Sequence, residues 1–156
     1  MDDIKYMMLA LEEAKNAFDE NEVPVGAVLV DENGRVIAKA HNRRECDKNA
    51  ILHAELMTIN EGCKALGGWR LHKCTLYVTL EPCPMCAGAI VNSRIKRVVY
   101  GAKDPKAGCF GSVLNLNSYP FNHKPEIISG VCEKQSLELM EKFFNRLREK
   151  RNEKNN

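Results

Sequence analysis

Long apolar runs are absent from this sequence. Its 156 residues contain no uninterrupted stretch of roughly 18 or more apolar residues, the length that a membrane-spanning helix requires. The amino end, Met1-Asp2-Asp3-Ile4-Lys5, also lacks the basic start and apolar centre of a secretory signal. We therefore expect a cytoplasmic protein that has no membrane partner.

An excess of charge of one sign is lacking too. The chain has 23 Lys and Arg against 21 Asp and Glu, a net charge of +2 with neutral histidines, so overall charge does not argue for a nucleic-acid partner. Cysteine, in contrast, is plentiful, with seven residues. In a reducing compartment these thiols are free, catalytic or metal-bound.

The hydrophobic pattern alternates between helical and strand periodicity. It predicts helices over residues 3–20, 50–66 and 86–91 and around 137–147, and strands over 25–30, 35–40, 75–79, 95–100 and 127–128. The first two strands flank an Asn33-Gly34 turn and form a hairpin. Gly67-Gly68 ends the second helix. Residues 101–125 form a long connection that we expect to be functional, because loops of that length are seldom mere linkers. This order predicts an α/β fold, a three-layer α/β/α sandwich with an about five-stranded mixed sheet and helices on both faces.

Two cysteines stand one helical turn apart, directly after a predicted strand. Cys83 and Cys86 lie at the amino end of a helix, whose dipole favours the thiolate form. Such a pair is typical of a metal site or of a thiol redox centre.

A histidine and a carboxylate upstream favour the metal. His53 with the two cysteines provides one nitrogen and two sulfur ligands, a set that suits Zn²⁺ and leaves a fourth tetrahedral position open for water. Bound zinc lowers the pKa of its water to about 7, and Glu55 can then accept and return a proton. A closed structural site would need a further ligand from Cys46, His72, Cys74 or Cys109.

The segments His53-Ala54-Glu55 and Pro82-Cys83-Pro84-Met85-Cys86 resemble the signature of the zinc nucleoside and nucleobase deaminases. An ordered set of segments over nearly the whole chain is similar to one family among them, the bacterial tRNA-specific adenosine deaminases: Val23-Pro24-Val25-Gly26-Ala27-Val28, Asn42-Arg43, Trp69-Arg70-Leu71, Tyr77-Val78-Thr79-Leu80-Glu81-Pro82-Cys83, Ser93-Arg94-Ile95, Tyr100-Gly101-Ala102 with Asp104, Asn122-His123 and Phe143-Phe144. The sequence departs from that family at Ile51-Leu52 and at Cys109-Phe110.

The resemblance implies a cytidine deaminase-like fold, with residues 1–150 as a single zinc-dependent deaminase domain and 151–156 as a charged tail without regular structure. It implies His53, Cys83 and Cys86 as the ligands of one Zn²⁺ per subunit and Glu55 as the catalytic proton carrier. Asn42 would bind the flipped base and Val25 would line its pocket. Without the resemblance, Asn42 reads equally well as a turn residue.

The implied substrate is the anticodon stem-loop of a tRNA with adenosine at the wobble position. The resemblance also implies a homodimer, which would convert this adenosine to inosine. Basic and aromatic residues near the end of the chain suit RNA, and we expect contacts from Lys106, Asn122, Phe144 and Arg148. A charged helix that merely faces solvent is the simpler interpretation of that region from charge pattern alone. Deamination of a free base such as guanine or cytosine is the alternative function.

Overall fold

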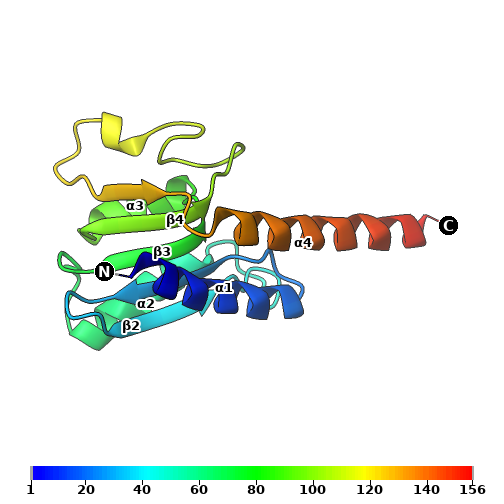
Figure 1. The fold of residues 1–156 in the computed structure, drawn as a ribbon, viewed down its shortest axis with the longest axis horizontal. Coiled ribbons are helices and arrows are strands. Elements are labelled where there is room, and N and C mark those ends of the chain that lie inside the picture. The colour runs from blue at the N-terminus through cyan, green and yellow to red at the C-terminus, as the bar shows by residue number, and fades with distance from the viewer. Residues whose placement is uncertain (1, 156) are drawn as a thin grey trace.

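The fold was analysed in a computed structural model that describes residues 2–155. Met1, the first residue of the predicted domain, and Asn156, the last residue of the predicted tail, lie outside the described residues. The elements are α1 (Asp3–Asp19), β1 (Gly26–Val30), β2 (Val36–His41), α2 (Ala54–Leu66), β3 (Thr75–Leu80), α3 (Pro84–Asn92), β4 (Arg97–Ala102), the 3₁₀ helix η1 (Leu116–Ser118), β5 (Glu126–Ser129) and α4 (Glu133–Lys154). Figure 1 shows their arrangement.

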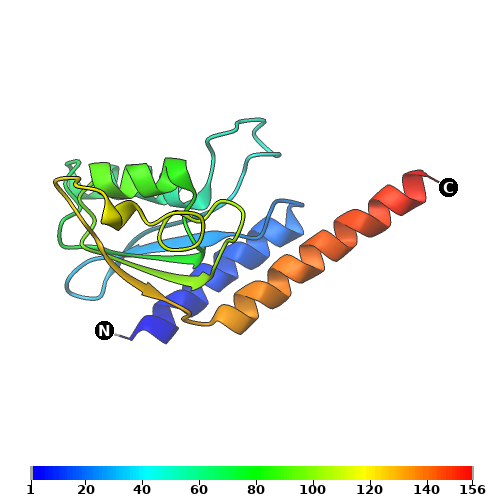
Figure 2. The same ribbon diagram turned by 90° about the horizontal axis from the view of Figure 1, so that it is seen from above.

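The strands form one five-stranded mixed sheet in the order β2-β1-β3-β4-β5. The hairpin partner β2 and the central strand β3 both pair antiparallel with β1, whereas β3, β4 and β5 run parallel. The predicted strand-helix-strand unit is therefore the parallel β3-α3-β4 connection. The three-layer α/β/α prediction is confirmed: α1 and α4 cover one face of the sheet, and α2 and α3 cover the other (Figure 2).

The two faces of the sheet bury two separate cores. Val28 and Val30 of β1 point to the α1 face and pack with Tyr6, Met7 and Ala10, while the alternate residues Ala27 and Leu29 belong to the core under α2 and α3. This explains why β1 is apolar at every position, because a strand covered on both faces has no wet side. Gly26 at its start lies so close to α1 that a Cβ atom would stand 2.0 Å from the Ala10 carbonyl oxygen.

Several boundaries differ from the predictions, and two of these differences have a clear physical cause. The second helix begins at Ala54 and not at residue 50, because residues 50–53 form a turn and an extended segment that places His53 at the N-cap. The last helix, α4, continues to Lys154, through residues where the charged sequence led us to expect no regular structure. Its Glu, Lys and Arg residues have high helix propensity, and the helix extends past the edge of the sheet (Figures 1 and 2).

Residues 101–125 are mostly irregular, as predicted, apart from the end of β4, one isolated bridge between Phe110 and Asn115, and η1. Among residues 2–155, no helix combines the length and the apolar character needed to cross a bilayer.

Candidate metal centre and active site

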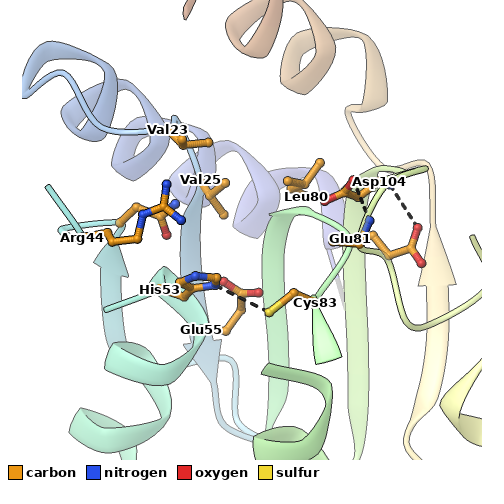
Figure 3. A pocket seen from close by; sticks show the side chains of 11 residues that line it. Val23, Val25, Arg44, His53, Glu55, Leu80, Glu81, Cys83 and Asp104 are labelled. Atoms are coloured by element: carbon orange, nitrogen blue, oxygen red, sulfur yellow. Dashed lines mark hydrogen bonds between the residues drawn. The ribbon is translucent and has the colours of Figure 1, made fainter. Parts of the chain in front are cut away.

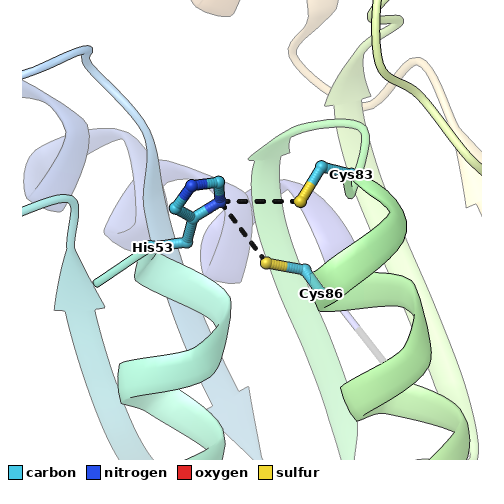
Figure 4. Close-up of side chains that lie close together, drawn as sticks. All are labelled: His53, Cys83 and Cys86. Carbon is cyan, nitrogen blue, oxygen red and sulfur yellow. Dashed lines mark hydrogen bonds between the residues drawn. The ribbon is translucent and has the colours of Figure 1, made fainter. Parts of the chain in front are cut away.

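The candidate site is built at the point where two helices begin. Strands β2 and β3 both run antiparallel to β1, so their carboxyl ends lie at the same edge of the sheet. The chain leaving β2 reaches the N-cap of α2 at His53, and the chain leaving β3 reaches the N-cap of α3 at Cys83. Cys86 lies in the first turn of α3. The topology thus brings together residues that are 30 positions apart (Figure 4).

The three side chains have the spacing of ligands around one small cation. Nδ1 of His53 lies 3.6 Å from Sγ of Cys83 and 3.6 Å from Sγ of Cys86, and the three ligand atoms all lie within 4.8 Å of one another. Zn–N and Zn–S bonds of about 2.0 and 2.3 Å in a tetrahedron put nitrogen and sulfur about 3.5 Å apart. His53, Cys83 and Cys86 therefore form a metal-binding group that fits zinc.

A fourth protein ligand is not part of this group. Of the candidates for a closed site, Cys46 is exposed, Cys74 is buried elsewhere, and the Cys109 thiol donates to the Ala107 carbonyl. Within residues 2–155 no Cys, His, Asp or Glu beyond the three joins the cluster. Three protein ligands with an open position are the pattern of a catalytic zinc site and not of a structural one.

One of the two thiols is already suited to bind a cation. Hydrogen bonding from Cys86, against the cost of burial, lowers the pKa of the Cys83 thiol to about 4. The same hydrogen bond raises the pKa of Cys86, and hydrogen bonding to Cys83 raises that of His53. At neutral pH the group therefore already holds one thiolate, the soft anionic ligand that zinc binds well.

Glu55 lies in the first turn of α2, two residues after His53, with 4% of its surface exposed. Burial raises its carboxyl pKa from 4.5 to about 6. A carboxylate with a pKa close to neutral exchanges protons readily in both directions, which is the property of a general acid-base group. Figure 3 shows its side chain beside His53 and Cys83.

These residues open into a pocket of about 160 Å³, several times the roughly 30 Å³ that one water occupies. Val25 and Asn42 both line this pocket. The Asn42 Oδ1 atom accepts a hydrogen bond from the backbone N–H of Ala54 at 2.8 Å. Asn42 thus caps α2, and with its oxygen engaged it has its amide N–H groups left to donate.

Six further residues line the pocket, although the sequence did not predict this role for them: Val23, Arg44, Leu80, Glu81, Asp104 and Ala107. Arg44 belongs to a loop that the buried carboxylate of Glu22 holds, by accepting the N–H groups of Glu45 and Cys46 at 2.9 and 2.6 Å. The sequence signal for such a loop is weak: Glu22 is an acidic residue directly before the apolar Val23, in a stretch that also contains Asp19 and Glu20.

The four expected RNA-contacting residues do not all lie together. Lys106 and Phe144 line one apolar groove next to the pocket, and the two cavities share Val23, Leu80 and Asp104. Asn122 is exposed in the loop before β5, and Arg148 is exposed on α4, where it contacts Asn145.

The guanidinium group of Arg146, on α4, packs against α1. It donates to the Phe18 carbonyl at 2.8 Å and stacks 3.9 Å from the Phe18 ring centroid. This contact fastens α4 to the end of α1.

Comparisons with known proteins agree with this geometry. The model of the MafB19-like deaminase family matches residues 1–148. The tRNA-specific adenosine deaminase of Bacillus subtilis is 55% identical over 94% of this chain and 91% of its own length, and that of Rickettsia bellii is 48% identical over 92% and 100%.

Solved structures of deaminases are similar to this chain as well. A structure from a study of A-to-I editing by tRNA:A34 deaminases at the wobble position superposes with a TM-score of 0.83, at 48% identity over 86% of this chain and 98% of that one. A guanine deaminase from Bacillus subtilis has a TM-score of 0.62, at 36% identity over 66% of each chain. With near-complete coverage at about half identity, the chain belongs to the tRNA-specific adenosine deaminases within the MafB19-like deaminase family.

Proposed function

We propose that this protein hydrolyses adenosine to inosine at the wobble position of a tRNA anticodon. The observation that carries the proposal is the buried Glu55 carboxylate beside the His53, Cys83 and Cys86 group, at one pocket that Asn42 also lines. Family membership specifies adenosine within tRNA as the substrate of this arrangement.

We assign His53, Cys83 and Cys86 as the ligands of one Zn²⁺. Zinc bound there would acidify a water molecule and so supply a nucleophile at neutral pH. The chain's own contribution to the proton transfers is Glu55. Its carboxylate takes a proton from the attacking water, delivers it to N1 of adenine as oxygen bonds to C6, and supports proton transfer to the leaving amine. The C6–N bond then breaks, and the products are inosine and ammonia.

The same pocket holds the base. Asn42 donates its free N–H groups to a ring acceptor of the purine, while the side chains of Val25 and Leu80 contribute apolar contact. Because the Asn42 oxygen is bound to the start of α2, the base is positioned relative to Glu55, which lies on that helix. This arrangement ties base recognition to the chemical step.

RNA outside the pocket is bound by residues around its mouth. We propose Lys106 and Phe144 as contacts, because they line the neighbouring groove, and a base can stack on an aromatic ring beside a cationic side chain. Asn122 and Arg148 are exposed and available for contacts further along the stem-loop. Because tRNA is the substrate, we place the protein in the cytoplasm.

We also propose a homodimer with one Zn²⁺ per subunit. Helix α3, Pro84-Met85-Cys86-Ala87-Gly88-Ala89-Ile90-Val91-Asn92, has no charged side chain, yet Met85, Gly88 and Ala89 are partly exposed on its outer side. A helix that is apolar all round is expected to be buried. A second copy packed on α3 would cover it, and sedimentation equilibrium with zinc analysis tests both statements.

The deciding experiment is detection of inosine by mass spectrometry after incubation of the zinc-loaded protein with an anticodon stem-loop that carries wobble adenosine. Glu55→Gln should abolish turnover while keeping zinc. Glu61→Gln is the matched control, because Glu61 lies on the same helix with its side chain 57% exposed. A stem-loop with adenosine moved one position away from the wobble site controls for positional specificity.

Free guanine, cytosine and adenine are assayed in parallel for ammonia release. Inosine at the wobble position alone supports the proposal. Ammonia from a free base with unchanged RNA would replace it by the alternative, a free-base deaminase. A protein without stoichiometric metal whose two cysteines cycle between thiol and disulfide would contradict both.

A further inference from the structure

A second buried carboxylate, Glu81, lies next to the metal-binding group but points away from it. Glu81 follows β3 directly and precedes Cys83 by two residues. Only 2% of its surface is exposed. In Figure 3 its side chain extends from the pocket wall toward Asp104 and away from His53. A buried carboxylate is costly unless it is fully hydrogen-bonded, so its partners show what the residue is for.

All side-chain partners of Glu81 come from one distant segment, residues 104–112. The Oε1 atom accepts from the backbone N–H of Asp104 at 3.1 Å and from the Ser112 hydroxyl. The Oε2 atom accepts from the backbone N–H groups of Phe110 and Ser112, both at 3.1 Å. One carboxylate thus satisfies three backbone donors and one hydroxyl in a stretch of chain that has no helix or strand of its own.

The segment also encloses the carboxylate sterically. A Cβ atom on Gly108 would stand 2.2 to 2.5 Å from the carboxylate atoms of Glu81, so only glycine fits there. The backbone N–H of Cys109 donates to the Pro82 carbonyl at 2.9 Å. The segment therefore wraps around Glu81 and Pro82, the two residues that lead into the first cysteine of the metal-binding group.

Two side chains of the same segment, Asp104 and Ala107, form one wall of the pocket. The Asp104 carboxylate makes only local hydrogen bonds, to the N–H groups of Lys106 and Ala107. Asp104 and Ala107 thus belong to the same short segment whose backbone N–H groups donate to the Glu81 carboxylate. Lys106, which lines the neighbouring groove, lies between them in the sequence.

We infer that Glu81 is a positioning residue for RNA recognition: its carboxylate holds segment 104–112 against the metal-binding group and so places the pocket wall at which the substrate binds. This inference rests on the proposed function and deepens it. Two neighbouring residues of the Glu81-Pro82-Cys83 segment then have different roles. Cys83 is a metal ligand, and Glu81 positions the pocket wall that binds the RNA.

The test is Glu81→Gln, compared with wild type in the zinc-loaded protein. Glutamine replaces one acceptor oxygen by an amide that faces N–H donors, so the segment loosens while α2, α3 and Glu55 stay in place. Losing hydrogen bonds to a charged group predicts a KM for the stem-loop about tenfold higher. We expect kcat within about twofold of wild type and unchanged zinc content. Amide hydrogen exchange should accelerate at Asp104, Phe110 and Ser112.

Asp31→Asn is the matched control. Asp31 is likewise largely buried and accepts the N–H groups of Asn33 and Arg35, both at 2.9 Å, but it lies at the opposite end of β1 from the pocket residue Val25. This variant should lose stability without a change in KM. If Glu81→Gln does not fold, Ser112→Ala tests the inference instead, because it removes the hydroxyl donor alone and should raise KM in the same direction by a smaller factor.

An unchanged KM together with wild-type exchange in residues 104–112 would overturn the inference. So would a loss of kcat in proportion to the folded fraction with KM unchanged, since that is the result of a stability role alone. If wild-type protein made no inosine, the proposed function would fail, and the exchange rates would still decide whether Glu81 holds the segment.

Discussion

Replacing Glu55 by glutamine should make the metal-free protein more stable at neutral pH, although it removes the proposed catalytic group. Burial raises the Glu55 pKa from 4.5 to about 6. Each pH unit corresponds to about 1.4 kcal/mol, so ionising this carboxyl in the folded protein costs about 2 kcal/mol. Glutamine has nearly the same shape and carries no charge, and the variant therefore avoids this cost.

The pH dependence has a definite sign. Because the folded-state pKa of Glu55 lies above its unfolded value, wild type loses stability relative to Glu55→Gln as the pH rises from 4.5 through about 6. The two proteins should have similar unfolding free energies at pH 4.5 and should differ by about 2 kcal/mol at pH 8.

Urea unfolding of both proteins in the presence of a chelator measures this difference at each pH. Glu61→Gln, on the exposed side of the same helix, should change the unfolding free energy by no more than about 0.5 kcal/mol. Equal stabilities of wild type and Glu55→Gln at pH 8 would refute the reasoning, because they would mean that the buried carboxylate is solvated or compensated in the folded state.

Three further predictions concern the metal, the packing and the amino-terminal helix. Cys83→Ser should lose stoichiometric zinc by elemental analysis while remaining folded by circular dichroism, and full zinc occupancy would contradict the ligand assignment. Gly26→Ala should lower the unfolding free energy in urea by about 3 kcal/mol, since its Cβ would lie 2.0 Å from a backbone oxygen of α1; an unchanged midpoint would contradict this packing. Hydrogen bonding from Arg97, against the cost of burial, lowers the pKa of Asp3, so Asp3→Asn should cost about 1 to 3 kcal/mol at pH 7. That difference should shrink as the pH falls below 3.8, because protonation breaks the same ion pair in wild type, and a pH-independent difference would rule out the ion pair as its source.

Much of the fold could be predicted from local pattern. Helix α1 and the hairpin of β1 and β2 follow from apolar spacing and the Asn33-Gly34 turn, and each observed bound differs by at most one residue. The start of α2 could not, because residues 50–53 have a suitable composition for a helix. The helix begins at Ala54, where the Asn42 side chain, twelve positions earlier in the sequence, accepts the Ala54 N–H.

The candidate metal ligands were likewise readable in the sequence. Cys83 and Cys86 lie one helical turn apart, and Glu55 follows His53 by two residues. The close spacing within each of these two segments is enough to predict metal ligands and a neighbouring carboxylate. That these two segments meet follows from the antiparallel hairpin, which returns β2 to the edge where β3 ends.

Only the tertiary structure decided how the pocket is walled. Glu22 holds the loop of Arg44, and Glu81 holds the loop of Asp104, although in the sequence neither residue belongs to a recognisable motif for holding a loop. Their partners are backbone N–H groups, which every residue except proline possesses. A hydrogen bond to such a group leaves no trace in residue identity, and it is therefore visible only when the chain is folded.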